Sequence, residues 1–323
     1  MMTIVVIITA ILIVVVGSQL LKMAELTAKS KGELIYNVSE KSGKIQGILM
    51  LTFMFVLIGF FFWQMYTWYG LRLPESASEH GTSIDFLSDV TYMIITPVFI
   101  LTHIVLLWFC YKYAYSSKRK ALFFSHSNKL EAIWTVTPAL VLTVLILMGL
   151  TSWNEIMTPI ASETDHVLIE LTGQQFNWTA RYAGDDNKLG RSHVTLIEGV
   201  NGTGVDADDL NANDDKIVKG EFHLPVGVPV QFVFRSLDVI HSAYMPHFRA
   251  QMNCVPGITT QFNFIPTITT EQMRAKTSNE EFNYVLLCNK ICGAAHYNMQ
   301  MDIIVESQED YDKWLADQKN FVE

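Results

Sequence analysis

The stretch "CNKICGAAHYNM", residues 288–299, places two cysteines, a histidine and a methionine at steps of four, four and three. These are Cys288, Cys292, His296 and Met299. The chain holds only 4 cysteines in 323 residues, so half of them lie in this one segment. Runs of strand-forming residues, 283–287 and 300–305, flank it, which predicts a loop between two strands. Thiolate, thioether and imidazole are soft ligands of copper, zinc and iron–sulfur clusters, so the loop is a candidate metal site.

A disulfide between Cys288 and Cys292 and a zinc site are two alternative interpretations of this loop. A disulfide leaves His296 and Met299 without a role, and zinc gains little from a methionine. A copper electron-transfer site in a β-sandwich needs a second histidine from an earlier strand. His241, in "RSLDVIHSAYMPHF", directly follows a run that alternates with period two and supplies it. Two cysteines four residues apart favour a binuclear centre, in which both thiolates bridge two copper ions that each carry one histidine.

The composition points to a membrane protein, because 50% of the residues are hydrophobic and only 17% are charged. Four apolar runs are each long enough to cross a hydrocarbon layer of ~30 Å. They are Ile4–Leu21, Ile45–Met65, Thr91–Cys110 and Leu130–Leu150. No basic residue precedes the first run and no small-residue cleavage pattern follows it, so an uncleaved span is expected rather than a signal peptide.

Charge patterning predicts the orientation of these spans. The segments between the first and second runs and between the third and fourth runs are rich in lysine, which predicts that both are cytoplasmic. Both termini are then expected outside. Residues 154–323 carry 12 Lys and Arg against 24 Asp and Glu. This acidic outer half makes nucleic acid an unsuitable partner and favours a basic protein partner.

The outer half changes at about residue 165 to short strand-like runs broken by turn residues, which predicts a β-sandwich or small barrel. No helix-period pattern is expected before the tail "SQEDYDKWLADQKN", residues 307–320. The segment "GVNGTGVDADDLNANDDK", residues 199–216, is expected to be a solvated loop. A calcium loop is the alternative there, but the segment lacks the twelve-residue spacing and the terminal glutamate.

The spacing Cys, three residues, Cys-Gly, two residues, His, two residues, Met resembles subunit II of the haem–copper cytochrome c oxidases. Two further stretches carry the resemblance: "DVIHS" around His241 and "EAIWTVTPALVL" at 131–142, which is similar to the start of the second hairpin helix of that family. The resemblance covers about residues 90–305. It implies four transmembrane helices followed by an all-β, cupredoxin-like sandwich that carries the dinuclear copper centre called CuA.

The resemblance also implies a ligand set for two copper ions. The implied ligands are the bridging thiolates of Cys288 and Cys292, the terminal imidazoles of His241 and His296, the weak axial Met299 and the backbone carbonyl of Lys290. The family usually has glutamate at this last position, where the carboxylate helps to hold magnesium or manganese at the boundary with subunit I. A lysine cannot do so, and we expect that ion to be absent or bound differently.

Two aromatic residues and one carboxylate are implied in electron uptake. The family's "GHQWYW" stretch reads "GQQFNW" at 173–178, so Phe176 stands where a tryptophan is thought to receive electrons, while Trp178 remains. The alternative is that Phe176 only packs. Asp238 matches the family's docking face for a basic cytochrome, where opposite charge would speed association. The alternative is that this acid only keeps the domain soluble.

Glu131 aligns with a family carboxylate near the cytoplasmic mouth of a proton-uptake channel into subunit I. Its alternative role is purely local, because an acidic residue near a helix N-terminus is favourable in any case. The implied domains are two additional spans at 1–71, a subunit II hairpin at 72–153, the periplasmic CuA domain at 154–308 and a helical tail at 309–323.

The implied function is electron transfer in an aa3-type cytochrome c oxidase of a bacterial inner membrane. Electrons would pass from a c-type cytochrome through the copper pair to haem in subunit I, with proton translocation. The motif Cys-x-x-Cys-His does not occur, so no covalently attached haem is expected. The donor is therefore expected to be a separate cytochrome, with a larger respiratory supercomplex as a hypothesis, alongside subunits I and III. A membrane-tethered copper chaperone or oxidase assembly factor is the alternative.

Overall fold

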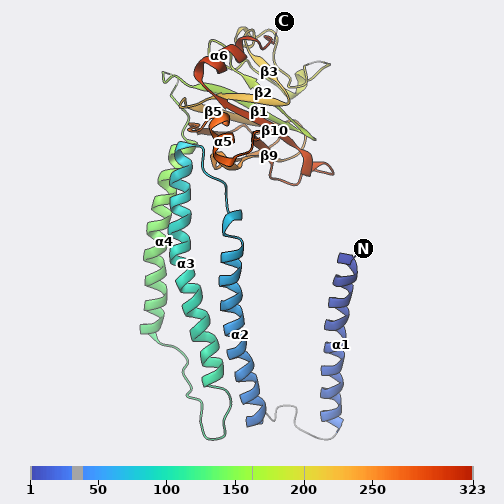
Figure 1. Cartoon of the computed structure of the whole chain (residues 1–323), viewed down its shortest axis with the longest axis vertical. Helices are drawn as coiled ribbons and strands as arrows, with labels where there is room; N and C mark the ends of the chain where they lie inside the picture. The colour runs from blue at the N-terminus through green and yellow to red at the C-terminus, as the bar shows by residue number, and fades with distance from the viewer. Residues whose placement is uncertain (1, 31–38, 162, 200, 322–323) are drawn as a thin grey trace. The chain divides into compact units, whose positions relative to one another are not determined.

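The computed structural model describes residues 2–30, 39–161, 163–199 and 201–321 (Figure 1). Its four long helices are α1 (Met2–Ser30), α2 (Glu40–Thr67), α3 (Glu79–Lys112) and α4 (Asn128–Met157). Each is long and apolar enough to cross a membrane. At most 11% of the most apolar part of each helix is buried inside the protein, so lipid would cover most of the apolar side chains. The prediction of four membrane-spanning helices is confirmed.

The helices fall into two compact units. One comprises the chain up to Thr67 together with Thr96–Ser127, and so contains α2 and the second half of α3. The other comprises Trp68–Ile95 and Asn128–Glu323, and so contains α4 and all the strands.

The outer domain is a sandwich of two five-stranded sheets. The first sheet has the strand order β3-β2-β1-β5-β8, with β1 Val167–Gln174, β2 Asn177–Tyr182, β3 Lys216–Val218, β5 Val230–Ser236 and β8 Thr260–Phe264. The second has the order β4-β10-β9-β6-β7, with β4 Glu221–Pro225, β6 His241–Met245, β7 Ala250–Cys254, β9 Tyr284–Cys288 and β10 Gln300–Glu306. The pairs β1–β5 and β4–β10 are parallel and the other pairs are antiparallel.

The core of the sandwich is built from alternating apolar residues of facing strands, as the period-two pattern predicts. On β5, Val230, Phe232 and Phe234 are at most 1% exposed, and on β10 Ile303 and Val305 are equally buried. Fully burying such side chains stabilises the fold by roughly 1.5–3 kcal/mol each. The expected β-sandwich following the helices is confirmed.

The first turns of α3 are fixed to the β domain by an ion pair within the second unit. The Arg249 guanidinium donates to both carboxylate oxygens of Asp85, from Nε at 2.7 Å and from Nη2 at 2.9 Å. Arg249 also donates to the carbonyl oxygens of Pro246 and Pro74. This bidentate geometry ties the turn after β6, and hence the strand that carries His241, to the helix.

Two sequence predictions about the outer domain are wrong. A helix, α5 (Thr270–Thr277), precedes the tail and is set by a capping box in which Thr269 and Gln272 bond each other's backbone N–H groups. The sequence feature that marks this helix is therefore its capping box, not a helical repeat of hydrophobic residues. The tail itself contains the expected helix, α6 (Gln308–Ala316).

The segment 199–216 is not simply solvated. Val205, Ala212 and Asp215 are at most 1% exposed. The Asp215 carboxylate accepts hydrogen bonds from Arg181 at 2.7 Å and from the Gly190 backbone N–H at 3.0 Å. A polar composition predicted an exposed loop, but an ion pair with a strand residue holds part of the segment against the sheet.

Candidate metal centre

The loop 288–299 joins two neighbouring strands of the second sheet. β9 ends at Cys288, and β10 begins immediately after Met299. β6 lies on the other side of β9, with Ala243 opposite Cys288 in the antiparallel register. Because β6 begins at His241, this register brings the histidine to the same end of the sheet as the loop.

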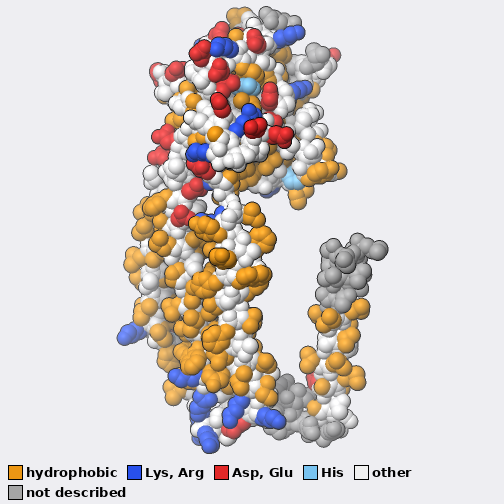
Figure 2. Space-filling model, in the orientation of Figure 1, with side chains coloured by type: hydrophobic (Ala, Val, Ile, Leu, Met, Phe, Trp, Pro, Cys, Tyr) orange, Lys and Arg blue, Asp and Glu red, His pale blue; other side chains and the backbone are white. Residues whose placement is uncertain are grey.

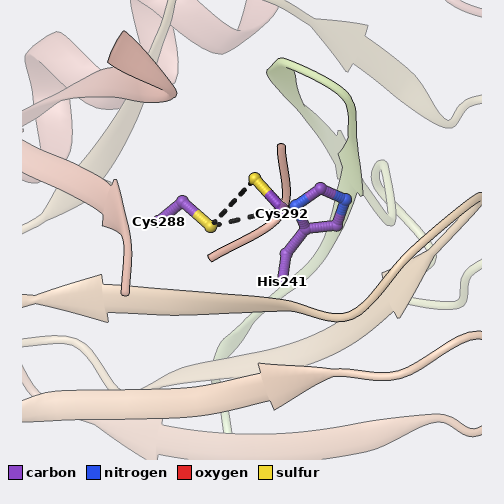
Figure 3. A group of neighbouring side chains, drawn as sticks. All are labelled: His241, Cys288 and Cys292. Atoms are coloured by element: carbon purple, nitrogen blue, oxygen red, sulfur yellow. Dashed lines mark hydrogen bonds between the residues drawn. The ribbon is translucent and has the colours of Figure 1, made fainter. Parts of the chain in front are cut away.

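Five side chains converge there. The Sγ atoms of Cys288 and Cys292 are 3.8 Å apart. His241 Nδ1 lies 3.8 Å from the first sulfur, and His296 Nδ1 lies 3.6 Å from the second. Met299 Sδ lies 3.8 Å from Cys292 Sγ. Figure 3 shows the two sulfurs facing each other, with the His241 ring beside them.

The Lys290 carbonyl oxygen completes the cluster, 3.2 Å from Cys288 Sγ. Each thiol therefore has one imidazole and one further soft or oxygen donor beside it. The ligand atoms of His241, Cys288 and Cys292 all lie within 4.8 Å of one another, a grouping that could hold a metal ion.

The site is largely shielded from water. His241 is 0% exposed, Met299 1% and Cys292 6%. Burial, followed by the neighbouring Cys288 thiol, raises the pKa of Cys292 to about 11. Both cysteines are free, and their separation is well beyond the ~2.05 Å of a disulfide bond. A cation that replaced the thiol protons would therefore satisfy sulfurs that the protein itself leaves without strong partners.

Asp238 orients His241. Its carboxylate accepts a hydrogen bond from His241 Nε2 at 2.8 Å, and from the backbone N–H groups of Gln175 and Val239 at 2.7 Å each. Burial alone would raise the pKa of Asp238, but these hydrogen bonds bring it below its usual value. With Nε2 as the donor, the Nδ1 lone pair is directed towards the sulfurs, as a metal-ligating histidine requires.

The turn between β1 and β2 closes over the loop. The Gln175 side chain donates a hydrogen bond to the Cys292 carbonyl oxygen. The Phe176 ring lies so close to Gly293 that a Cβ at that position would come within 2.8 Å of it. Gly293 also has a φ of 146°, so both its contact and its backbone conformation require glycine.

Trp178 is a second aromatic residue beside the cluster. It is 2% exposed and packs edge-on against His241, with ring centroids 6.0 Å apart. Phe176 therefore contacts the loop at Gly293, while Trp178 contacts a candidate ligand directly. Within the described part of the chain, the Trp178 indole Nε1 has no hydrogen-bond partner.

Comparison with known proteins identifies the family. Residues 66–154 match the family described as cytochrome c oxidase subunit II, transmembrane domain, and residues 167–308 match its periplasmic domain. An alternative cytochrome c oxidase subunit 2 from Bradyrhizobium diazoefficiens is 34% identical over 239 residues, which are 74% of this chain and 81% of that one. The chain belongs to the cytochrome c oxidase subunit II family.

Two further matches share less sequence identity with this subunit II. Cytochrome c oxidase subunit 2 of Thermostichus vulcanus is 26% identical over 269 residues, covering 75% of this chain and 77% of that one. The crystal structure of the periplasmic domain of subunit II (CoxB) of Bradyrhizobium japonicum aligns with 50% of this chain and 95% of its own, at 21% identity and a TM-score of 0.33.

This subunit II is a multi-pass membrane protein with a periplasmic β domain. Helix α1 and all but the last two residues of α2 precede the matched region.

The fold of subunit II brings most of the predicted site residues together but leaves one apart. His241, the loop ligands, Phe176, Trp178 and Asp238 all surround the thiol pair. Glu131 lies in the first turn of α4, and the β domain follows the last turn of that helix. A helix of 30 residues spans ~45 Å, so Glu131 has no part in the metal centre itself.

Sequence reasoning missed two neighbours of the cluster. Gln175 was overlooked because its contact with Cys292 depends on the turn that follows β1. Cys254 lies opposite His241 in the β6–β7 register and is fully buried. Burial, with a smaller effect of Cys288, raises the pKa of Cys254 to about 12. The cysteine count was the only signal that could have drawn attention to it.

Proposed function

We propose that this site is a dinuclear copper centre and that the chain takes up electrons for a cytochrome c oxidase. The observation that carries the proposal is the arrangement of two thiols 3.8 Å apart with a separate imidazole beside each sulfur. This donor set fits two soft ions held by shared thiolates, and a methionine sulfur favours copper over zinc.

The protein residues would hold the ions and limit their rearrangement. Cys288 and Cys292 would hold them through their thiolates, and His241 and His296 through their imidazoles. Met299 and the Lys290 carbonyl oxygen would be the weaker donors. When bound, the copper pair would supply one-electron redox chemistry at low reorganisation cost. Asp238 holds the His241 tautomer, and Gln175 fixes the backbone of the loop at Cys292.

The proposed electron path runs from a separate c-type cytochrome through this centre to haem in subunit I of an aa3-type oxidase. Relatives named cytochrome c oxidase subunit 2 support this role. The acidic outer half suits a basic cytochrome, and Asp238, Phe176 and Trp178 are the residues proposed on the approach. Subunit III is a further proposed partner. Oxygen reduction would be coupled to proton translocation. Glu131 is proposed to lie near the mouth of a proton-uptake channel. The proposed location is a bacterial inner membrane.

Lys290 also bears on whether a magnesium ion binds at the boundary with subunit I. Its exposed side chain is a cation, which disfavours a divalent ion at the same position. We propose that magnesium at the subunit I boundary is absent or held by other residues. Metal analysis of the purified oxidase would contradict this if it found a stoichiometric divalent ion bound beside Lys290.

Electron uptake can be measured directly by mixing the purified copper-loaded oxidase with a reduced c-type cytochrome in a stopped-flow instrument. The proposal predicts rapid bleaching of the copper absorbance, slowed by salt as screening weakens the charge attraction. Absence of electron transfer, combined with release of the copper to an apo-acceptor protein, would instead favour the copper chaperone.

A further inference from the structure

A basic cavity lies within the first compact unit, where α2 begins and α3 ends. It has a volume of about 400 Å³ and is lined by Lys44, Lys112 and Arg119, together with Tyr111, Tyr115 and Ser116. Figure 2 shows Lys and Arg side chains gathered at this end of the two helices. None of these residues belongs to the copper site or lies in the matched outer domain.

The two helices pack closely beside this cavity. Gly43 and Gly47 of α2 are both buried. A Cβ on Gly43 would come within 3.2 Å of the Tyr115 carbonyl oxygen, and one on Gly47 within 3.3 Å of the Ala114 Cβ. The glycines therefore let the loop after α3 approach α2, while the longer side chains beside them surround the open space.

The positive charge of the cavity is only partly offset by the protein, through the Coulombic attraction between Glu40 and Lys44. Residues 39–48 and 111–127 contain six Lys and Arg but a single acid, Glu40. The Glu40 carboxylate is already engaged, since its Oε1 accepts hydrogen bonds from the Ser117 N–H and hydroxyl groups and from the Ser116 hydroxyl. Among the described residues, neither Lys44 nor Lys112 forms an ion pair with a carboxylate.

Arg119 has a structural role beside these two lysines. Its Nη1 and Nη2 donate to the carbonyl oxygens of Lys112 and Ala114 at 2.6 and 2.9 Å. A guanidinium at the last carbonyls of α3 is favourable for the helix dipole. Arg119 thereby fixes one wall of the cavity, and the ammonium groups of Lys44 and Lys112 remain as donors for an anion, with Lys112 Nζ 5.7 Å from the centroid of the Tyr113 ring.

The surroundings place the cavity at the level of lipid headgroups. Because the β domain is periplasmic, α4 ends and α3 begins on that side, so α3 ends and α2 begins on the cytoplasmic side. Trp108, Tyr111 and Tyr115 are exposed aromatics of the kind enriched at membrane interfaces. Ile48, which lines the cavity, and its neighbour Leu49 are about half exposed and would face acyl chains.

We propose that this cavity binds the phosphate headgroup of an anionic membrane lipid in the cytoplasmic leaflet. Lys44 and Lys112 would contact the phosphate, and the acyl chains would lie along the apolar side chains of α2. Basic pockets between transmembrane helices on the cytoplasmic side have the charge and position that such headgroups require.

The experiment is native mass spectrometry of the intact purified oxidase after exchange into vesicles of phosphatidylcholine alone or of phosphatidylcholine mixed with phosphatidylglycerol. We expect the wild-type chain to retain phosphatidylglycerol selectively. The double variant Lys44→Gln/Lys112→Gln should bind it about thirtyfold more weakly, which corresponds to roughly 1 kcal/mol for each lysine. Its copper absorbance should be unchanged, which separates this test from that of the electron-transfer role.

The double variant Lys41→Gln/Lys120→Gln is the matched control, because it removes the same charge from the same end of the unit without altering the cavity lining. It should retain the lipid as the wild type does. Equal losses in the two double variants, or equal retention of both lipids by the wild type, would overturn the proposal. Complete displacement of phosphatidylglycerol by excess inorganic phosphate would also overturn it, by assigning the cavity to a soluble anion.

Discussion

Two buried clusters of ionisable side chains in the β domain differ in composition. One contains side chains of both charges, whereas the other contains none of fixed charge. On the first sheet, Arg181 lies between Glu170 and Asp215, at 3.0 and 2.7 Å, and all three side chains are at most 4% exposed. Arg235 adds a second cation at 3.3 Å from Glu170. At the end of the second sheet, two thiols lie 3.8 Å apart with only imidazoles, a thioether and a carbonyl around them.

This difference in pairing indicates which buried cluster has a structural role and which is a candidate ligand site. In the first cluster Arg181 pairs with both carboxylates and so holds Asp215 against the sheet, although Asp215 Oδ1 has no hydrogen-bond partner among the described residues. In the second cluster every group is a donor to a metal and no cation is present among the side chains. A buried cluster of this kind is therefore a candidate ligand site, because burying polar groups without strong partners is costly.

Breaking the second cluster should have the largest effect. If Cys288 is a ligand of a copper pair, as proposed, Cys288→Ser should reduce the copper content from two ions to at most one and lower oxygen-reduction activity by at least about a hundredfold. The loss exceeds the ten- to hundredfold typical of an outer-shell change because a direct ligand is removed. Metal analysis and oxygen uptake measure the effect. The control Cys254→Ser removes a nearby buried thiol outside the cluster and should keep both ions; equal losses would contradict the assignment.

Breaking the first cluster should affect stability rather than copper. Arg181→Met leaves Glu170 with only Arg235 and leaves Asp215 without its cation, and we expect a loss of about 3–5 kcal/mol in the free energy of unfolding. Denaturant unfolding followed by fluorescence would measure it. The matched control is Arg191→Met, because Arg191 pairs with Asp206 and Asp209 but its side chain is 74% exposed. That change should cost less than about 1 kcal/mol.

The pH dependence should distinguish the buried carboxylate from the exposed ones. Burial raises the pKa of Asp215 from 3.8 to about 6, despite the opposing effect of Arg181. Protonation therefore favours the folded state: this contribution is present below pH 3.8 and is lost as the pH rises to about 6. Relative to Asp215→Asn, the wild type should lose roughly 3 kcal/mol across that window, at 1.36 kcal/mol per pKa unit. A difference that stays constant between pH 4 and 7 would contradict it.

The smallest effect should come from the residue that orients a ligand without binding the metal. Asp238→Asn keeps the shape of the side chain but removes the charge that accepts from His241 Nε2. We expect copper affinity to fall about tenfold to a hundredfold, with both ions still bound at saturation. Competition with a chelator would measure it, and Asp208→Asn, an exposed acid away from the loop, serves as the control. If Asp238 acted only in docking, the variant would change the salt dependence of cytochrome association and leave copper affinity unaltered.

Patterns within single segments could be predicted from the sequence, whereas contacts that depend on strand register could not. The four spans follow from hydropathy, the sandwich from period-two alternation, and the ligand loop from the spacing of Cys288, Cys292, His296 and Met299. His241 could be predicted because it directly follows a run that alternates with period two and lies in the stretch "DVIHS". The Arg181–Asp215 pair and the positions of Cys254 and Gln175 depend on pairings between distant segments, which no local pattern encodes. For the same reason the acidic segment 199–216 was expected to be solvated.

The most direct test of the central claim is copper analysis with electron paramagnetic resonance on the purified chain, reduced before copper loading. With one imidazole beside each of two adjacent thiols, the proposal predicts two copper ions per chain, with the unpaired electron spread equally over both nuclei. One copper ion with a localised spectrum would contradict a dinuclear centre. No retained copper, with Cys288 and Cys292 joined in a disulfide that re-forms after reduction, would contradict a metal site altogether.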